Sequence, residues 1–196
     1  MRARKPRSIK RLMKIYFMRH GQTNYNVRGL CNDDPRSPVH LTALGEQQAE
    51  AAAERLKNAR LDRIVVSELP RTRETAAIIN RHHGVPVMTH PAINDIRSGF
   101  NDRPVAEYMA AIAHDPLRAR INGGESLLDH KARVLGFLDW LRTQPDRAVL
   151  VIAHEETLRV IAARFRGLTD DAMRALAFAN GEVIEFDLDV TADKRR

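Results

Sequence analysis

The sequence has 196 residues, of which 43% are hydrophobic and 29% charged, and a formal net charge of +7. This length predicts one domain rather than two of full size, and no apolar run approaches the ~18 residues needed to cross a bilayer, so we expect no membrane partner and a cytoplasmic protein. The single cysteine, Cys31, excludes an internal disulfide framework and agrees with a reducing compartment.

The positive charge is concentrated at the amino end of the chain. Residues 1–14 contain seven arginines and lysines and no acid, and +7 minus these seven leaves the rest close to neutral. We therefore divide the chain into a basic arm, residues 1–13, and a single domain, residues 14–196. A neutral body lacks the positive field of a dedicated DNA-binding domain, so nucleic acid is not an expected partner. Three interpretations of the arm stay open: a solvated tail, a start codon placed upstream of Met13, and a targeting or polyanion-binding segment.

Short apolar runs, several rich in β-branched residues, predict buried strands at 15–18, 64–66, 85–88, 148–153 and 183–188. Helical patterns lie between these runs. One helix begins at the N-cap Thr42, another is opened by Ser126 with Asp129 three residues later, and another follows His154. A helix after Pro104 presents an apolar face made of Val105, Tyr108, Met109 and Ile112. Strands that alternate with helices predict an α/β fold, a three-layer α/β/α sandwich with a mostly parallel central sheet.

Three polar motifs follow three of the predicted strands. Arg19 and His20 come after the first, the segment SELPR (67–71) after the second, and AHEET (153–157) after the fourth. In an open α/β sheet the loops at the carboxyl ends of the strands line the ligand crevice. We therefore expect His20, Arg71 and His154 to meet there, although they are far apart in the sequence.

Two histidines and two arginines form a set that suits an oxyanion better than a metal ion. The motifs contain no cysteine pair and no acid cluster in metal-ligand spacing, so we predict no metal. Guanidinium groups stay charged and offer fork-shaped donors that match phosphate oxygens. A neutral histidine between them can attack phosphorus and form a phosphohistidine, and the neighbouring positive charge disfavours the protonated imidazolium.

Five segments resemble, in the right order, the signatures of the histidine phosphatase superfamily, in its phosphoglycerate mutase-like branch. They are RHGQTNYN (19–26), LTALGEQQA (41–49), SELPRTRETA (67–76), GGES (123–126) and VLVIAHEETLR (149–159). The resemblance covers most of the chain from about residue 14. It implies the fold of that branch, a metal-independent phosphomonoester hydrolase without a cofactor, and a small-molecule phosphomonoester as the binding partner.

The same resemblance implies roles for individual residues. His20 would be the phosphorylated nucleophile, with Arg19, Arg71 and His154 clamping the transferred group. Thr23 and Asn26 match positions that help to bind that group, and Gly21 would let the substrate approach the backbone. The general acid of the family is a glutamate in the pattern Leu-x-Glu-x-x-x-Gly; here INDIRSG (93–99) places Asp95 there, with Glu107 and Glu125 as fallback acids.

The sequence departs from many relatives at residues 154–156, where His-Glu-Glu replaces His-Gly-Gly. Glu155 and Glu156 would add negative charge beside an anionic substrate unless they point away or pair with an arginine such as Arg159. This departure argues against a highly charged bisphosphate as the substrate.

Two alternative functions stay open. A phosphoglycerate mutase would return the phosphoryl group to the same carbon skeleton, but such enzymes usually have a longer insertion than the 58 residues that separate Asp95 from His154. A non-catalytic phosphate-binding or regulatory module would keep the pocket and lose the chemistry. The sequence makes no prediction of the oligomeric state.

Overall fold

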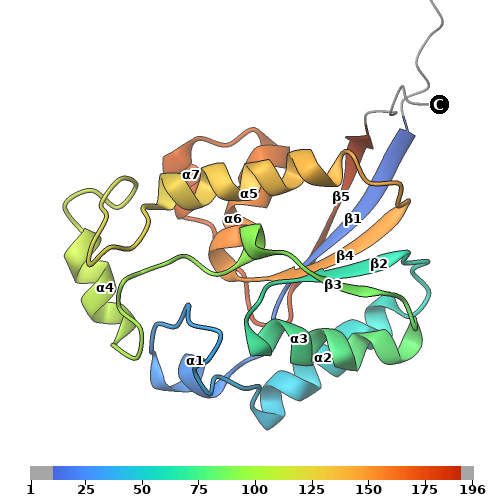
Figure 1. The fold of residues 1–196 in the computed structure, drawn as a ribbon, viewed down its shortest axis with the longest axis horizontal. Coiled ribbons are helices and arrows are strands. Elements are labelled where there is room, and N and C mark those ends of the chain that lie inside the picture. Colours follow the sequence, from blue (N-terminus) through green and yellow to red (C-terminus); the bar gives the residue numbers. More distant parts are fainter. Residues whose placement is uncertain (1–10, 191–196) are drawn as a thin grey trace, which may run out of the picture.

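The computed structural model describes residues 11–190, which form a central five-stranded sheet with helices on both faces (Figure 1). The strands are β1 (Arg11–Arg19), β2 (Arg63–Val66), β3 (Val87–Thr89), β4 (Ala148–Ala153) and β5 (Val183–Val190). Their order in the sheet is β3-β2-β4-β1-β5. The first four are parallel and β5 runs antiparallel to β1, so the predicted α/β sandwich with a mostly parallel sheet is confirmed.

The register of the parallel strands brings their carboxyl ends to one edge of the sheet. Arg19 at the end of β1 pairs with Ala153 at the end of β4, and Val66 at the end of β2 pairs with Ile152. Because β4 lies between β2 and β1, His154 after β4 lies between Ser67 after β2 and His20 after β1. This register places the three polar motifs together.

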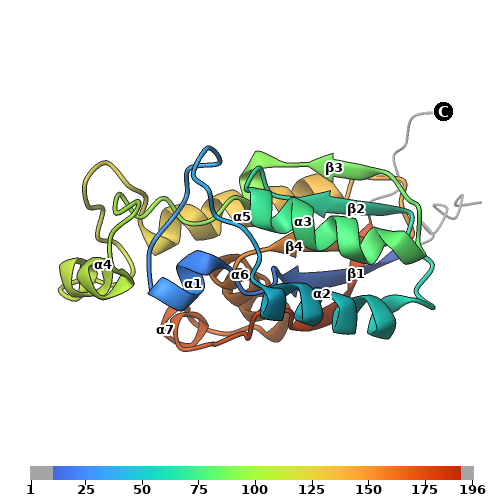
Figure 2. The same cartoon turned by 90° about the horizontal axis from the view of Figure 1, so that it is seen from below.

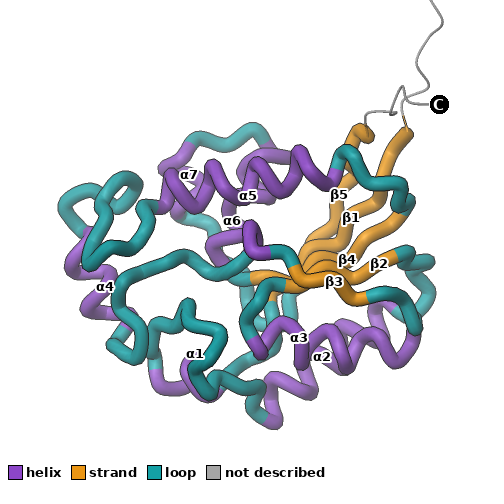
Figure 3. The backbone as a smooth tube through the Cα atoms, viewed as in Figure 1, coloured by secondary structure: helices purple, strands orange, loops and turns teal. Residues whose placement is uncertain are grey.

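Helices cover both faces of the sheet (Figures 1 and 3). The helices α2 (Ala43–Leu56) and α3 (Pro70–Ile79) lie on one face, and α5 (Leu127–Leu141), α6 (Glu155–Arg166) and α7 (Asp170–Arg174) lie on the other. The remaining elements are α1 (Asn24–Arg28), α4 (Val105–Ile112) and the short 3₁₀ helices η1 (Asn80–His82) and η2 (Pro91–Ile93).

Alternate side chains of the strands fill two cores, one on each face of the sheet. In β1, Ile15 and Phe17 belong to the core beneath α5 and α6, whereas Met18 belongs to the core beneath α2 and α3. The same alternation holds in β4, where Val151 and Ile152 face opposite cores. Since both faces of these strands are buried, their sequences are continuous apolar runs.

Two of the predicted helix starts are confirmed by their caps. The Thr42 side chain accepts a hydrogen bond from the N–H of Gly45 at the start of α2. Ser126 and Asp129 form a reciprocal capping box at the start of α5, in which each side chain bonds the other residue's backbone N–H. Each cap satisfies donors that a helix leaves unpaired at its first turn.

The apolar face predicted for residues 105–112 is only partly buried. Ile112 is buried, but Val105 is 41% exposed and Met109 is 49% exposed. Figure 2 shows the reason, because α4 lies beyond the carboxyl ends of the strands and does not pack on the sheet. This face of α4 is therefore available to a ligand.

The first strand begins at Arg11, so residues 11–13, which the sequence analysis assigned to the basic arm, belong to the sheet. Arg11 pairs with Val190, its guanidinium donates to the backbone oxygen of Gln144 at 2.7 Å, and Met13 is fully buried. Residues 1–10 of the arm lie outside the described residues. Within residues 11–190, no helix is long and apolar enough to cross a membrane.

Candidate active site

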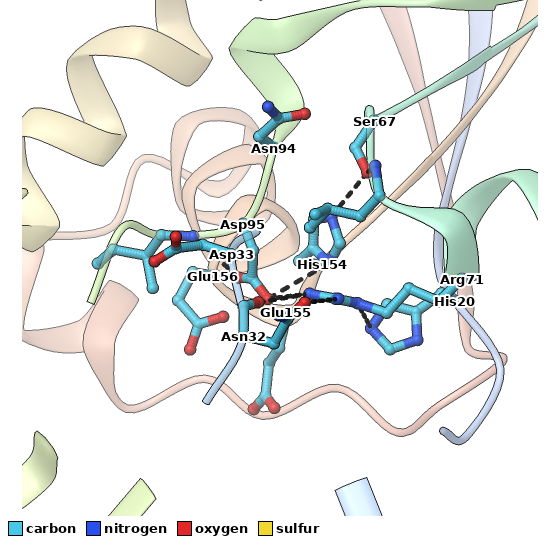
Figure 4. A network of polar contacts seen from close by, with 12 residues as sticks. His20, Asn32, Asp33, Ser67, Arg71, Asn94, Asp95, His154, Glu155 and Glu156 are labelled. Carbon is cyan, nitrogen blue, oxygen red and sulfur yellow. Dashed lines mark hydrogen bonds and ion pairs between the residues drawn. The ribbon is translucent and has the colours of Figure 1, made fainter. Parts of the chain in front are cut away.

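A cavity of about 210 Å³ lies at the carboxyl ends of β1, β2 and β4. The charged and titratable groups on its wall include the predicted site residues and two glutamates: Arg19, His20, Arg71, Asp95, His154, Glu155 and Glu156. Figure 4 shows His20, Arg71, Asp95 and His154 converging from four separate segments of the chain. The structure thus brings together the groups that the sequence analysis placed at the strand ends.

His20 follows β1 and is buried, with its ring held from both sides. Nδ1 lies 2.7 Å from the carbonyl oxygen of Gly21, and because a carbonyl can only accept, Nδ1 carries the hydrogen. Nε2 is then the atom with a free electron pair, and it accepts a hydrogen bond from Nε of Arg71 at 3.1 Å. Burial, with smaller contributions from the charges of Arg71 and His154, lowers the pKa of His20 well below its usual value. The imidazole is therefore neutral near pH 7.

His154 is the N-cap residue of α6 and lies beside His20, with the ring centroids 5.2 Å apart. Its Nε2 is 2.9 Å from the Ser67 hydroxyl, and its Nδ1 is 3.4 Å from Oδ2 of Asp95 without hydrogen-bond geometry. Burial lowers the pKa of His154 well below its usual value, and the charge of Arg71 adds to the effect. Both histidines are thus neutral and face the same cavity.

Arg71 is the central cation of the site. It lies in the first turn of α3 and is buried. Besides its bond to His20, the guanidinium donates to the side-chain and backbone oxygens of Asn32, both at 3.0 Å, and to Oδ2 of Asp95 at 2.7 Å. Asn32 was missed in the sequence analysis. It follows α1 in a loop, six residues after the first motif and outside all five, and no local pattern marked it.

Arg19 is the last residue of β1 and is already partly neutralised. Its Nη1 lies 2.7 Å from Oε2 of Glu155 and donates to the backbone oxygen of Phe178 at 2.5 Å. Glu155 also accepts from Arg159 at 2.6 Å, and Arg159 lies 3.6 Å from Glu156. Both glutamates therefore lie within ion-pair distance of Arg159, which is one of the two possibilities that the sequence left open. The additional pair between Glu155 and Arg19 was not foreseen.

Thr23 and Asn26 line the cavity through a capping box at the start of α1. The N–H of Thr23 donates to Oδ1 of Asn26 at 2.9 Å, and the N–H of Asn26 donates to Oγ1 of Thr23 at 3.1 Å. The Asn180 side chain adds a donor to the same Oδ1 at 3.3 Å. These bonds use the Asn26 oxygen, so its Nδ2 is the atom that can donate to an anion.

Gly21 has a different role from the one expected. It does not line the cavity, and a Cβ placed on it would lie 2.2 Å from the backbone oxygen of Gly45. A Cβ on Gly45 would in turn lie 2.0 Å from the backbone oxygen of Gln22. The two glycines let the loop after β1 pack directly on the first turn of α2. Gly21 thus serves the packing behind His20 rather than the approach of substrate.

Of the three acids predicted as proton donors, Asp95 is the one on the cavity wall. Glu107 pairs with Arg103 at 2.9 Å on the exposed side of α4. Burial raises the pKa of Glu125, but hydrogen bonds from His130, Arg133 and the backbone N–H of Arg97 outweigh that effect and bring it to about 2. Glu125 is therefore a structural carboxylate. It links the loop that carries Asp95, through the N–H of Arg97, to Arg133 of α5.

Glu156 is a further acid on the cavity wall. It lies in the first turn of α6, and burial, together with the charge of Asp95, raises the pKa of its carboxyl group to about 7. The thiol of Cys31 also lines the cavity, and burial raises its pKa to about 11, so it stays protonated. Within residues 11–190, no three histidine, cysteine or acidic side chains are grouped so that they could hold a metal ion.

Comparison with known proteins identifies the class to which this fold and site belong. Residues 15–193 match the model of the histidine phosphatase superfamily (branch 1), and the chain belongs to that family. It is 28% identical over 185 residues to the probable phosphoglycerate mutase GpmB of Enterobacter sp. (strain 638), covering 90% of this chain and 85% of the relative.

Solved structures of phosphatases share the fold. The α-ribazole phosphatase from Shigella flexneri superposes with a TM-score of 0.79 at 27% identity, covering 88% of this chain and 89% of that one. A mycobacterial glucosyl-3-phosphoglycerate phosphatase, solved with VO3, gives a TM-score of 0.75 at 25% identity, covering 88% of this chain and 92% of that one. The relatives therefore include phosphatases and a protein described as a probable mutase.

Proposed function

We propose that the protein is a metal-independent phosphomonoester hydrolase that works through a phosphohistidine at His20. The observation that carries this proposal is the buried cluster at the strand ends, in which a neutral His20 presents Nε2 beside Arg71 and His154. Membership of the superfamily supports it, as do the phosphatases among the structural relatives. VO3 in the mycobacterial relative is an oxyanion of the kind that this cluster would hold.

The phosphoryl group would bind between the arginines and His154. Within residues 11–190, Nε of Arg19 and Nδ1 of His154 are buried polar atoms without a hydrogen-bond partner, and both residues line the cavity. A buried donor left unpaired costs ~1–3 kcal/mol, which a phosphate oxygen would recover. If the Ser67 hydroxyl donates to Nε2 of His154, Nδ1 carries the hydrogen and can donate to that oxygen.

His20 would then attack phosphorus through Nε2, since a phosphate oxygen that accepts from Arg71 releases that atom from its present hydrogen bond. The phosphate oxygen that takes the place of Asp95 on Arg71 leaves this carboxylate free to bind a proton from solvent. As the nitrogen–phosphorus bond forms and the phosphorus–oxygen ester bond breaks, Asp95 gives that proton to the leaving alcohol. In the second step Asp95 removes a proton from water, whose oxygen attacks phosphorus. Phosphate leaves and the neutral imidazole is restored.

The nucleophile is tested by His20→Ala. We expect turnover of phosphomonoesters without added metal to fall on the order of 10⁴-fold or more, because the covalent intermediate cannot form. Acid-labile, base-stable labelling of the protein by a ³²P-substrate should disappear with it. Circular dichroism of the variant checks the fold, and undiminished turnover in a folded His20→Ala protein contradicts the mechanism.

The proton donor is tested by Asp95→Asn with two kinds of leaving group. An alkyl phosphate needs a proton on its leaving oxygen, whereas p-nitrophenolate leaves as a stable anion. We expect kcat for the alkyl ester to fall about 10²–10⁴-fold and kcat for p-nitrophenyl phosphate to fall much less. Asp95→Glu, which keeps the carboxyl group, is the control. Equal losses on both esters would show that Asp95 only holds Arg71.

A mutase activity is the second candidate, because sequence relatives are described as probable phosphoglycerate mutases. A coupled assay for the interconversion of 2- and 3-phosphoglycerate distinguishes the two activities. We expect hydrolysis without interconversion. Interconversion that exceeds hydrolysis would make the protein a mutase, and phosphate binding without any turnover would make it a non-catalytic module.

A further inference from the structure

The cavity wall carries more acidic than basic side chains. Its cations are Arg19 and Arg71, and each is already in an ion pair, with Glu155 at 2.7 Å and with Asp95 at 2.7 Å. Among the described residues that line the cavity, no lysine and no further arginine is present. Both arginines would be used by the phosphoryl group. A carboxylate or second phosphate elsewhere on the substrate would therefore find no cation to pair with.

Glu156 contributes to this excess of acidic over basic side chains on the cavity wall. Its side chain is 27% exposed and its nearest recorded cation, Arg159, lies at 3.6 Å and bonds Glu155 more closely, at 2.6 Å. Arg159 does not line the cavity. Glu156 thus faces the substrate with little compensation, and because its pKa is raised to about 7 the repulsion of a neighbouring anionic group is partial at pH 7 and grows as the carboxyl group ionises above that pH.

The outer wall of the cavity is apolar. The half-exposed side chains of Val105 and Met109 from α4 line it, together with Tyr108 and Leu30. Two backbone hydrogen bonds, from Val105 to Gly29 at 2.8 Å and from Cys31 to Arg103 at 2.9 Å, hold this wall to the loop after α1. A methionine and an aromatic ring on one helix offer a surface for a flat or apolar ligand group.

We propose that the substrate is a phosphomonoester whose alcohol part is uncharged and has an apolar or planar face, such as an aryl or nucleoside group. Glu156, together with the lack of an uncommitted cation among the described residues of the cavity wall, disfavours alcohols that carry a carboxylate or a second phosphate. This inference rests on the proposed phosphatase function and narrows its substrate class.

We call the discrimination against a second anionic group on the substrate the charge rule. It is tested with a pair of esters that share one carbon skeleton. Glycerol 1-phosphate has a neutral hydroxymethyl group where 3-phosphoglycerate has a carboxylate. We expect kcat/KM to be at least about tenfold higher for the neutral ester, which corresponds to ~1.4 kcal/mol. Glu156→Gln should reduce this ratio about fivefold, mainly by lowering KM for 3-phosphoglycerate. Glu50→Gln removes an exposed charge from α2, outside the cavity, and should leave the ratio unchanged.

The apolar wall is tested with 2-naphthyl phosphate against glycerol 1-phosphate. Met109→Ala should raise KM for the naphthyl ester about fivefold or more and leave that for the glycerol ester within about twofold, since only the larger ester reaches α4. Val87→Ala is the matched control, because Val87 is 46% exposed on β3 and does not line the cavity.

The outcomes separate this inference from the function on which it rests. If His20-dependent turnover is found but 3-phosphoglycerate is hydrolysed as well as glycerol 1-phosphate, or Glu156→Gln leaves the ratio unchanged, only the charge rule is wrong. If neither ester is turned over and no phosphohistidine forms, the hydrolase proposal is wrong. Calorimetric binding of the two esters then still tests the charge rule, and equal affinities would overturn it.

Discussion

At the scale of single residues, the structure shows how His20 is prepared for the nucleophilic role that we propose for it. The carbonyl of Gly21 holds the hydrogen of His20 on Nδ1, and burial keeps the ring neutral, so the electron pair of Nε2 points to the same space as Arg71. No proton has to be removed before attack. This arrangement buries several polar groups, which is unfavourable because they lose their hydrogen bonds to water. Hydrogen bonds among these groups, and those to a bound substrate, offset that loss.

Glu155 is the residue whose removal has the clearest local consequence. Its ion pair with Arg19 competes with any phosphate oxygen that approaches the same guanidinium. We expect Glu155→Gln to lower the inhibition constant of inorganic phosphate about fivefold, corresponding to ~1 kcal/mol for a partly buried pair. Product inhibition of p-nitrophenyl phosphate hydrolysis measures this, with Glu50→Gln as the control. Weaker inhibition in the variant would mean that Glu155 positions Arg19 rather than competing for it.

At the scale of elements, the site depends on how closely the loop after β1 packs on α2. The capped start of α2 at Thr42 places Gly45 against Gly21 with no room for a Cβ on either. The same loop carries His20, so the contact positions His20 at the cavity wall. A local glycine motif thus serves the site through packing between two elements.

The Gly21→Ala variant should therefore have a lower free energy of unfolding than the unsubstituted protein. The added Cβ would lie 2.2 Å from a backbone oxygen, and overpacking of this kind costs about 1–3 kcal/mol of unfolding free energy. Gly136→Ala is the matched control, because a Cβ at that position in α5 meets no atom within 4 Å and should stabilise the helix by about 0.5–1 kcal/mol. Urea denaturation measures both. Equal midpoints for the two variants would contradict the packing role of Gly21.

At the scale of the whole molecule, the length of β1 separates Arg11, the first residue that the structure describes, from the candidate site. The nine residues of β1 run from Arg11 to Arg19, so the point where the arm joins the sheet lies about 26 Å from the site at roughly 3.3 Å per residue. Figure 1 shows α4 and the start of β1 at opposite ends of the molecule.

Deletion of residues 1–10 should leave kcat/KM for phosphomonoesters within about twofold, because the remaining chain keeps all of β1 and the site. The deletion stops before Arg11, whose side chain bonds the loop that precedes β4. If the full chain binds RNA or DNA in a salt-dependent way and the shortened chain does not, the arm is a separate polyanion-binding segment. A large loss of turnover on deletion would instead tie the arm to the site.

The strands, most of the helices and the chemical groups of the site could be predicted from the sequence. Short continuous apolar runs predicted the five strands of the described sheet. The three polar motifs that follow strands predicted that His20, Arg71 and His154 converge. These features are local, since each depends on residues within a few positions of one another. The family resemblance added roles to them.

The side chains that complete the cavity, and their partners, could not be predicted without the three-dimensional structure. Asn32 reaches Arg71, Glu155 pairs with Arg19, Glu125 turns away to Arg133, and the apolar face of α4 lies open at the cavity instead of on the sheet. Each outcome depends on where a loop passes in space, which no pattern of neighbouring residues encodes. The charge around the cavity is thus a property of the packed loops, whereas Arg19 and His20, the residues proposed to bind and attack the phosphoryl group, can be identified from the first strand and the two residues at its end.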